Sequence, residues 1–208
     1  VILLASCEFN KSVKVDLLTG LSTKGNGLRV NDVYLTVKDD KVKRNTFTYG
    51  EQFYLNFNDV TGFKKEGANV FPGMELSVVN EAGDTVMYYE DMYADKTSGV
   101  DVTPLLLNTY LTVAKPIMSN NEYNLFVNIW DKKGTGTYTA DFKFDVKPNE
   151  HISVENDESI AYDNIYLFSK EQGTVVDNKV NIGETYYLLM EGVEGFAVTD
   201  GKISVGLS

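Results

Sequence analysis

The chain is poor in the residues on which most catalytic sites depend. Its 208 residues include one cysteine (Cys7), one histidine (His151) and one tryptophan (Trp130). Zinc sites require several cysteine or histidine ligands, and a serine triad requires a histidine positioned as base. No Gly-x-Ser-x-Gly elbow and no phosphate-binding Gly-x-x-x-x-Gly-Lys-Ser/Thr loop is present. A single cysteine also excludes a disulfide framework. We therefore expect no catalytic residues, no cofactor and no enzymatic activity.

Basic charge and long apolar runs are also scarce. Lysine and arginine number 19 against 30 aspartates and glutamates, which gives a net charge of -11. Nucleic-acid-binding domains need clustered basic residues, so this composition excludes nucleic acid as a partner. No apolar run approaches the roughly 20 residues that a membrane-spanning helix needs. We expect the chain beyond its N-terminal residues to be soluble.

The N-terminus carries a short sorting motif. The apolar residues Val1, Ile2 and Leu3 lead into Leu4-Ala5-Ser6-Cys7, and polar sequence follows at once. This order resembles the lipobox of bacterial lipoproteins, in which the mature protein begins at the lipidated cysteine. The resemblance implies lipidation of Cys7, a membrane partner through the lipid anchor, and a place in the bacterial cell envelope, with the outer membrane favoured. The alternative is a short first strand with a buried free cysteine.

The rest of the sequence is typical of antiparallel β-structure. Tyrosine (13) and phenylalanine (11) are abundant, and aromatic residues favour strands. Between Tyr138 and Val146, apolar residues alternate strictly with polar ones, as in a strand with one wet face. Similar alternation occurs at 53–58 and 105–113, and turn residues separate these segments. The pattern predicts an all-β, antiparallel β-sandwich.

The chain contains a diverged internal repeat. Asn31-Asp32-Val33-Tyr34-Leu35 matches Asp163-Asn164-Ile165-Tyr166-Leu167, and Gly50-Glu51-Gln52-Phe53-Tyr54-Leu55 matches Gly183-Glu184-Thr185-Tyr186-Tyr187-Leu188. Val60-Thr61-Gly62-Phe63 likewise matches Val193-Glu194-Gly195-Phe196, and Leu76-Ser77-Val78 matches Ile203-Ser204-Val205. We expect the end of a signal peptide at 1–6, a lipidated tether with the first strand region at 7–27, a first sandwich at 28–148, and a second at 149–208. The second copy lacks a counterpart of residues 79–148, so we expect it to be incomplete, with truncation of the sequence as the favoured explanation.

The segment from Pro116 to Pro148 adds a resemblance. A strand opens at Tyr123, a turn begins at Asp131, and a last strand ends before Pro148. This arrangement is similar to the closing hairpin of immunoglobulin-like modules in bacterial surface lipoproteins. The resemblance implies tandem immunoglobulin-like sandwiches, a class whose members serve as spacers, adhesins and glycan binders, and it implies no reaction.

Two groups of residues are candidates for binding. If Tyr123, Leu125, Val127 and Ile129 face the core, then the opposite face of the same strand carries Asn124, Phe126, Asn128 and Trp130. Rings stack on the C–H faces of sugars and amides bond hydroxyls, so this face is a candidate glycan site. The alternative is that a loop or the second copy covers these rings.

The second group is acidic. Glu90, Asp91 and Asp95 lie close together in the sequence and are interleaved with Tyr89 and Tyr93. Carboxylates on a loop can bind calcium, which takes six to eight oxygen ligands, although no EF-hand pattern is present. The tyrosines are candidates for either a binding surface or the core, and the alternative for the carboxylates is a solvated acidic loop.

These observations favour a non-enzymatic cell-envelope lipoprotein that binds or presents a ligand, either a glycan or a surface protein. A structural spacer for a further C-terminal domain is the first alternative. A glycoside hydrolase is the second, because such an enzyme needs only two carboxylates and the chain has 30 acidic residues.

Overall fold

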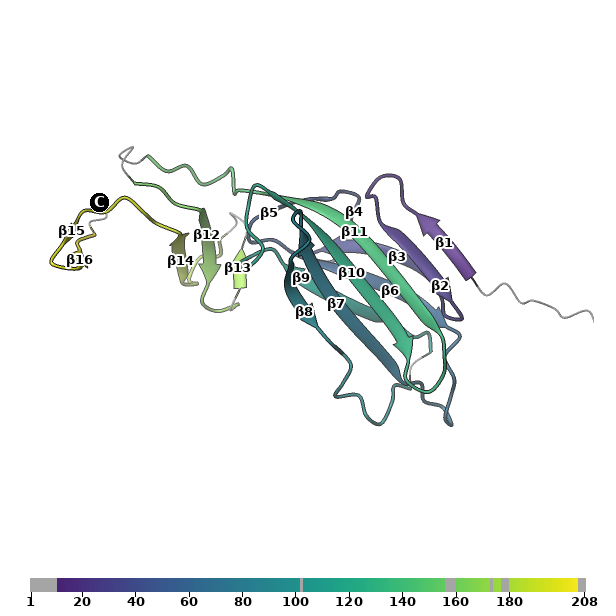
Figure 1. Ribbon diagram of the computed structural model, residues 1–208. Coiled ribbons are helices and arrows are strands. Elements are labelled where there is room, and N and C mark those ends of the chain that lie inside the picture. The colour runs from purple at the N-terminus through teal and green to yellow at the C-terminus, as the bar shows by residue number, and fades with distance from the viewer. Residues whose placement is uncertain (1–10, 102, 156–159, 173, 177–179, 206–208) are drawn as a thin grey trace, which may run out of the picture. The chain divides into compact units, whose positions relative to one another are not determined.

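The protein is built from β-strands. The computed structural model describes residues 11–101, 103–155, 160–172, 174–176 and 180–205 (Figure 1). In these ranges every regular element is a strand, which confirms the predicted all-β class. No helix long and apolar enough to cross a membrane occurs in this part of the chain. The lipobox and Cys7 lie outside the described residues.

The strands vary from two to eleven residues in length. Their bounds are β1 (Lys11–Val15), β2 (Ser22–Asn26), β3 (Arg29–Val37), β4 (Asp40–Val42), β5 (Thr46–Thr48), β6 (Gln52–Thr61), β7 (Pro72–Asn80), β8 (Thr85–Tyr89), β9 (Leu107–Thr112), β10 (Asn121–Asp131), β11 (Thr137–Lys147), β12 (Asn164–Ser169), β13 (Thr174–Val176), β14 (Tyr186–Glu191), β15 (Val198–Thr199) and β16 (Lys202–Ile203).

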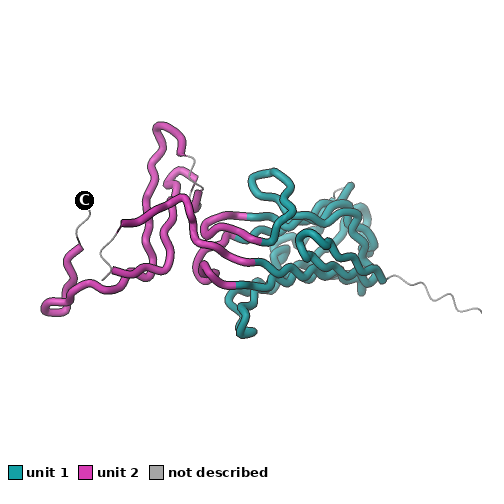
Figure 2. The backbone as a smooth tube through the Cα atoms, turned by 90° about the horizontal axis from the view of Figure 1, so that it is seen from above, with its two compact units in different colours: residues 1–45, 53–111, 122–144 teal, residues 46–52, 112–121, 145–208 magenta. Residues whose placement is uncertain are grey.

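The chain divides into two compact units, which Figure 2 colours separately. Unit 1 comprises residues 1–45, 53–111 and 122–144, and unit 2 comprises residues 46–52, 112–121 and 145–208. The larger sheet has the order β1-β2-β11-β10-β7-β8, with β5 pairing in parallel with the end of β11. The second sheet has the order β4-β3-β6-β9, and the smaller sheets are β13-β12-β14 and β15-β16.

Unit 1 is a sandwich of the two larger sheets. Phe53 of β6 makes edge contacts with Phe142 and Phe144 of β11, with ring centroids 5.9 and 5.6 Å apart. Phe57 of β6 meets Tyr138 of β11 in the same way at 6.2 Å. These rings are almost completely buried. The predicted β-sandwich is therefore confirmed, and aromatic residues from the facing strands form its core.

The predicted inward faces are confirmed strand by strand. The buried residues include Phe53, Leu55, Phe57, Leu105, Leu107, Thr109, Leu111, Val113, Tyr123, Leu125, Val127, Ile129, Tyr138, Ala140, Phe142, Phe144 and Val146. Strict alternation places every second residue of a strand on the same side of the sheet, so their neighbours face outward. In the described part of the predicted range 7–27, residues 11–27, lie the strands β1 and β2, and β2 pairs with β11 in the larger sheet.

The repeat is visible in the pairing of the strands. In the first copy Leu35 of β3 lies opposite Leu55 of β6, and in the second copy Leu167 of β12 lies opposite Leu188 of β14. The bridge between Ala161 and Glu194 corresponds to the pair Arg29 and Thr61. Corresponding residues thus form corresponding pairs along the whole hairpin, which confirms the duplication.

Backbone conformation repeats as well. Asp59 and Gly192 have φ of 54° and 65°, Gly62 and Gly195 have 98° and 95°, and Gly50 and Gly183 have 98° and 94°. The copies diverge after this hairpin. In the first copy β7 pairs with β10, whereas Ile203, in the segment matching β7, pairs with Val198 in a short hairpin.

Candidate functional site

The predicted β10 site lies on the outward face of the larger sheet. Phe126, Asn128 and Trp130 stand opposite Ser77, Glu75 and Gly73 of β7, respectively. Phe126 is 38% exposed, and the other predicted members are half-buried. The four residues therefore share a face, but their individual environments differ.

Trp130 packs on its own sheet. A Cβ atom placed on Gly73 would lie 2.2 Å from Cε2 of the Trp130 indole, so the ring lies directly over the glycine backbone. Cross-strand pairing of an aromatic residue with glycine covers exposed backbone and stabilises a sheet. One side of the only tryptophan is therefore used for packing and is closed to a ligand.

The other members of the β10 face are partly occupied. The Asn124 amide, oriented to satisfy its neighbours, donates to Asp141 Oδ1 at 3.0 Å and to the Phe142 carbonyl at 3.2 Å. Phe126 is 38% exposed and pairs with Ser77 of β7. Ser77 also pairs with Tyr88 of β8, which is 55% exposed. This face offers two exposed rings separated by a serine.

The acidic cluster is organised as a structural turn. Asp91 forms an ion pair with Lys132 at 2.6 Å and accepts backbone N–H groups of Tyr93 and Met74 at 2.9 and 3.2 Å. Partial burial raises the pKa of Asp91, but Lys132 and the two N–H groups outweigh it and hold the pKa below its ordinary value. Asp91 thus stays ionised and fixes the turn.

The remaining residues of that group do not converge. Asp95 pairs with Lys96 at 2.9 Å, and the Tyr93 hydroxyl accepts the Asn108 N–H at 3.3 Å. Tyr89 is 52% exposed at the edge strand β8, and Glu90 follows it. Among the residues that the structure describes, no three histidine, cysteine or acidic side chains come together as a metal site.

The four-stranded sheet presents a richer outward face. Tyr34 of β3, Tyr54, Asn56 and Asn58 of β6, and Tyr110 of β9 point away from the buried side of their strands. We call these five residues the tyrosine–amide face. The Tyr54 and Tyr110 rings are 5.7 Å apart at an angle of 42°, and Tyr110 is 53% exposed. The face therefore combines an aromatic pair with a line of amides.

The amides of this face are held in place. Asn58 Nδ2 donates to the Tyr34 hydroxyl at 3.1 Å. Asn56 Nδ2 donates to Thr36 Oγ1 at 3.2 Å and to the Tyr34 carbonyl at 3.5 Å. The donor side of each amide is thus engaged within the sheet, which leaves the carbonyl oxygen, Oδ1, as the acceptor that the amide offers to a ligand. Preorganised polar groups bind ligands with a smaller entropy cost.

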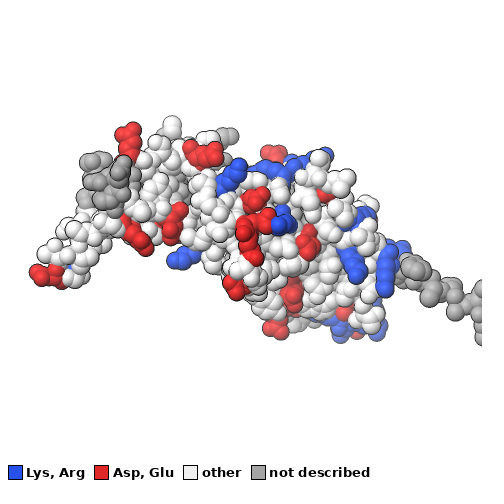
Figure 3. Space-filling view, turned by 45° about the horizontal axis from the view of Figure 1, so that its top comes forward, with Lys and Arg blue, Asp and Glu red and all other residues white. Residues whose placement is uncertain are grey.

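Charge on this face is balanced locally. The Lys41 ammonium lies 3.7 Å from the centroid of the Tyr34 ring and pairs with Asp32 at 2.8 Å. Both side chains of the pair are more than half exposed. Elsewhere, acidic and basic side chains are intermixed on the face drawn in Figure 3. The five residues of the tyrosine–amide face are uncharged, and the Lys41–Asp32 pair lies beside them.

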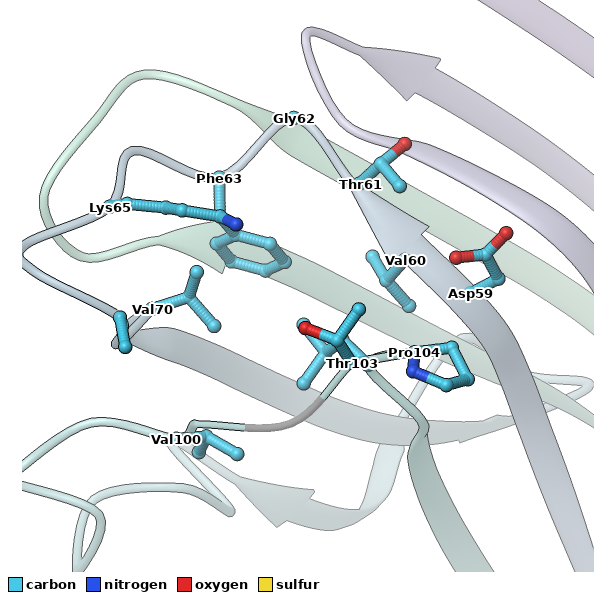
Figure 4. Close-up of a pocket in the computed structure, with 12 residues that line it drawn as sticks. Asp59, Val60, Thr61, Gly62, Phe63, Lys65, Val70, Val100, Thr103 and Pro104 are labelled. Atoms are coloured by element: carbon cyan, nitrogen blue, oxygen red, sulfur yellow. The ribbon is translucent and has the colours of Figure 1, made fainter.

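One pocket occurs beside the end of β6. Its volume is about 290 Å³, and Val60, Phe63, Val70 and Thr103 surround the hollow, with the Lys65 side chain beside the Phe63 ring (Figure 4). This volume is at the lower end of the range for small-molecule sites. Asp59 is the single carboxylate in the lining. The pocket therefore does not bring together the two carboxylates that glycoside hydrolysis requires.

Comparison with known proteins adds little. No family model matches the chain, and no curated protein matches it. A solved structure described as the C-terminal domain of wzt is similar to it, with a TM-score of 0.43 and 10% identity, over 83% of this chain and 87% of that chain. A likeness this weak indicates no ligand.

Proposed function

We propose that the chain is a non-enzymatic lipoprotein of the bacterial cell envelope that binds glycan through its first sandwich, at the tyrosine–amide face. The observation that carries the proposal is the juxtaposition of the Tyr54–Tyr110 ring pair with the fixed amides of Asn56 and Asn58. Aromatic faces with a few well-placed polar groups are typical of sites that orient a ligand.

The chemistry of the face suits a sugar chain. Exposed tyrosine rings provide flat apolar area for the C–H side of a sugar ring, and each hydroxyl adds a polar handle. The Asn56 and Asn58 carbonyl oxygens accept hydrogen bonds from sugar hydroxyls. Binding of this kind needs no nucleophile, no cofactor and no metal.

This face is a better candidate than the predicted β10 face. Trp130 is packed on Gly73, and Asn124 is engaged with Asp141, so two of the four β10 residues have less free surface. On the tyrosine–amide face Tyr110 is 53% exposed, and bonds within the sheet orient the amides of Asn56 and Asn58. The β10 face serves as the internal comparison in the experiment.

The experiment is a glycan-array screen of the full chain carrying Cys7→Ser, which cannot be lipidated. We expect specific binding that is lost in Tyr54→Ala and Tyr110→Ala and kept in Phe126→Ala and Trp130→Ala. The reverse pattern would return the site to β10. A blank array with a folded chain would reject glycan binding and favour a spacer, which the tandem repeat also supports.

The anchor is tested separately. Our proposal that Cys7 carries lipid is supported by the sequence Leu4-Ala5-Ser6-Cys7 alone. In cells that express the natural precursor, we expect the wild-type protein in the membrane fraction and Cys7→Ser in the soluble fraction. A membrane-bound Cys7→Ser protein would contradict the lipoprotein proposal and leave the glycan site untouched.

A further inference from the structure

The second copy contains an occupied version of the candidate site. The residues that match Tyr34 and Asn58 are Tyr166 and Glu191, because the strand pair Asp32 and Asn58 corresponds to the pair Asn164 and Glu191. Both copies join the two positions by a hydrogen bond across the strands. Asn58 Nδ2 donates to the Tyr34 hydroxyl at 3.1 Å, and the Tyr166 hydroxyl donates to Glu191 Oε1 at 2.7 Å.

In unit 2 the Tyr166–Glu191 pair is in contact with a third side chain, Tyr49. The Tyr49 hydroxyl donates to Glu191 Oε2 at 2.7 Å, and the Tyr49 ring centroid lies 5.4 Å from that of Tyr166. Tyr49 is 2% exposed and Tyr166 is 8% exposed. Burial first, and then the bond to Glu191, raise the pKa of Tyr49 well above its ordinary value, so the hydroxyl keeps its proton. The pair therefore holds an uncharged ring that donates a hydroxyl.

We infer that the Tyr34–Asn58 pair of the first copy binds an uncharged sugar residue in the same manner. A hydroxyl of the sugar donates to Asn58 Oδ1, and the C–H side of its ring lies against the tyrosine. This inference rests on the proposed glycan function and adds the ligand class: neutral glycans bind and acidic glycans do not.

The hydrogen-bonding capacity of the face supports this selectivity. Asn56 Nδ2 is engaged by Thr36 and by the Tyr34 carbonyl, so Oδ1 is the group that the amide offers to a ligand. Carboxylate and sulfate groups only accept hydrogen bonds, so they find no partner in these oxygens. The net charge of -11 on the chain further disfavours anionic sugars.

Lys41 lies beside the pair and is already engaged in an ion pair. Its ammonium lies over the Tyr34 ring and forms an ion pair with Asp32 at 2.8 Å. A sugar ring that stacks on Tyr34 displaces this exposed side chain from the ring. Lys41 keeps its partner Asp32 after that displacement, so it does not become a receptor for an anion.

The first test compares neutral oligosaccharides with uronate-, sialate- and sulfate-bearing ones on a single array, using the Cys7→Ser chain. We expect binding to be confined to neutral glycans. Equal or preferential binding of acidic glycans would overturn the ligand class while the glycan function stands. No binding at all by a folded chain would overturn both.

The second test uses the acceptor at position 58 and the best neutral oligosaccharide from the array. Asn58→Ala removes the acceptor, and calorimetry should show affinity lower by about threefold to tenfold, the value of one neutral hydrogen bond. Asn58→Glu reproduces the acceptor of the second copy and should restore binding. Asn128→Ala, an equally half-buried asparagine on the other sheet, is the matched control and should not change it. Unchanged affinity in Asn58→Ala, or loss in Asn58→Glu, would overturn the inference.

Discussion

The two hairpins β3–β6 and β12–β14 share one pairing register, yet their inward faces have different environments. Leu35 and Leu55 are each 1% exposed in the first copy, whereas Leu188, the counterpart of Leu55, is 55% exposed. Register in a hairpin follows from local sequence and turn geometry. Burial follows from the facing sheet, which the first copy has in β7, β10 and β11. The pairing register of the hairpin therefore does not depend on burial of its inward face by a second sheet.

The largest effect is expected at a core position of the hairpin. Phe57 is completely buried, so Phe57→Ala should lower the free energy of unfolding by about 3–5 kcal/mol. Its counterpart Met190 is only half-buried, and Met190→Ala should cost less than about 1 kcal/mol. Urea denaturation of both variants measures the difference. Similar costs at the two sites would mean that the second hairpin has a covering sheet.

The next effect concerns the glycine before each second strand. Gly50 has a φ of 98°, and a Cβ there would lie 2.3 Å from Val175 Cγ1. Gly183 has a φ of 94°, and a Cβ there would meet nothing within 4 Å. Both alanine substitutions carry backbone strain of about 1–2 kcal/mol, but Gly50→Ala adds overpacking of about 1–3 kcal/mol. Thermal unfolding should rank Gly50→Ala below Gly183→Ala, and the opposite order would refute the close contact.

A smaller effect depends on pH. Burial, and then the bond to Glu191, raise the pKa of Tyr166 to about 12. Because the folded pKa exceeds the unfolded value of about 10, the stabilisation is complete below pH 10 and is lost as the pH rises toward 12. Tyrosinate absorbance and circular dichroism across this range should show late ionisation coupled to loss of structure in unit 2. Tyr166→Phe removes the ionising group and should lessen the alkaline sensitivity, and an unchanged profile would contradict the assignment.

The smallest effect on stability is expected at the ligand face. Tyr54 and its counterpart Tyr187 both point outward, so replacing either by alanine should change stability by less than about 1 kcal/mol. Only Tyr54→Ala should lower glycan affinity, because Tyr187 has no partner ring equivalent to Tyr110 among the described contacts. Parallel melting and binding curves separate the two properties. Loss of binding in Tyr187→Ala would place a site in the second copy instead.

Much of the fold could be predicted from local pattern. Alternation over Tyr138–Val146 gave the correct inward face, and the twelve-residue spacing between Gly50 and Gly62, repeated between Gly183 and Gly195, anticipated the common register. These features depend on neighbours in the sequence. The identities of facing strands were harder to predict, because they depend on contacts between distant segments.

The candidate site depends on contacts between distant strands, which the sequence does not show. Alternation along 123–130 placed Trp130 on the outward face, but nothing in β10 revealed that β7 would place Gly73 beneath its ring. The outward alternation of Tyr54, Asn56 and Asn58 was visible in the sequence. Its value as a site emerged only when β3 and β9 brought Tyr34 and Tyr110 beside it.

The matched left-handed residues Asp59 and Gly192 have unequal evolutionary freedom. A Cβ at residue 192 would lie 2.0 Å from the Asp163 carboxylate, so this position accepts only glycine unless Asp163 changes with it. Asp59 shows that the first copy already carries a side chain at the same bend, with φ of 54°. Position 59 can therefore be occupied by glycine, asparagine or aspartate, whereas position 192 is constrained by the Asp163 side chain. Homologous sequences should vary more at position 59 than at position 192.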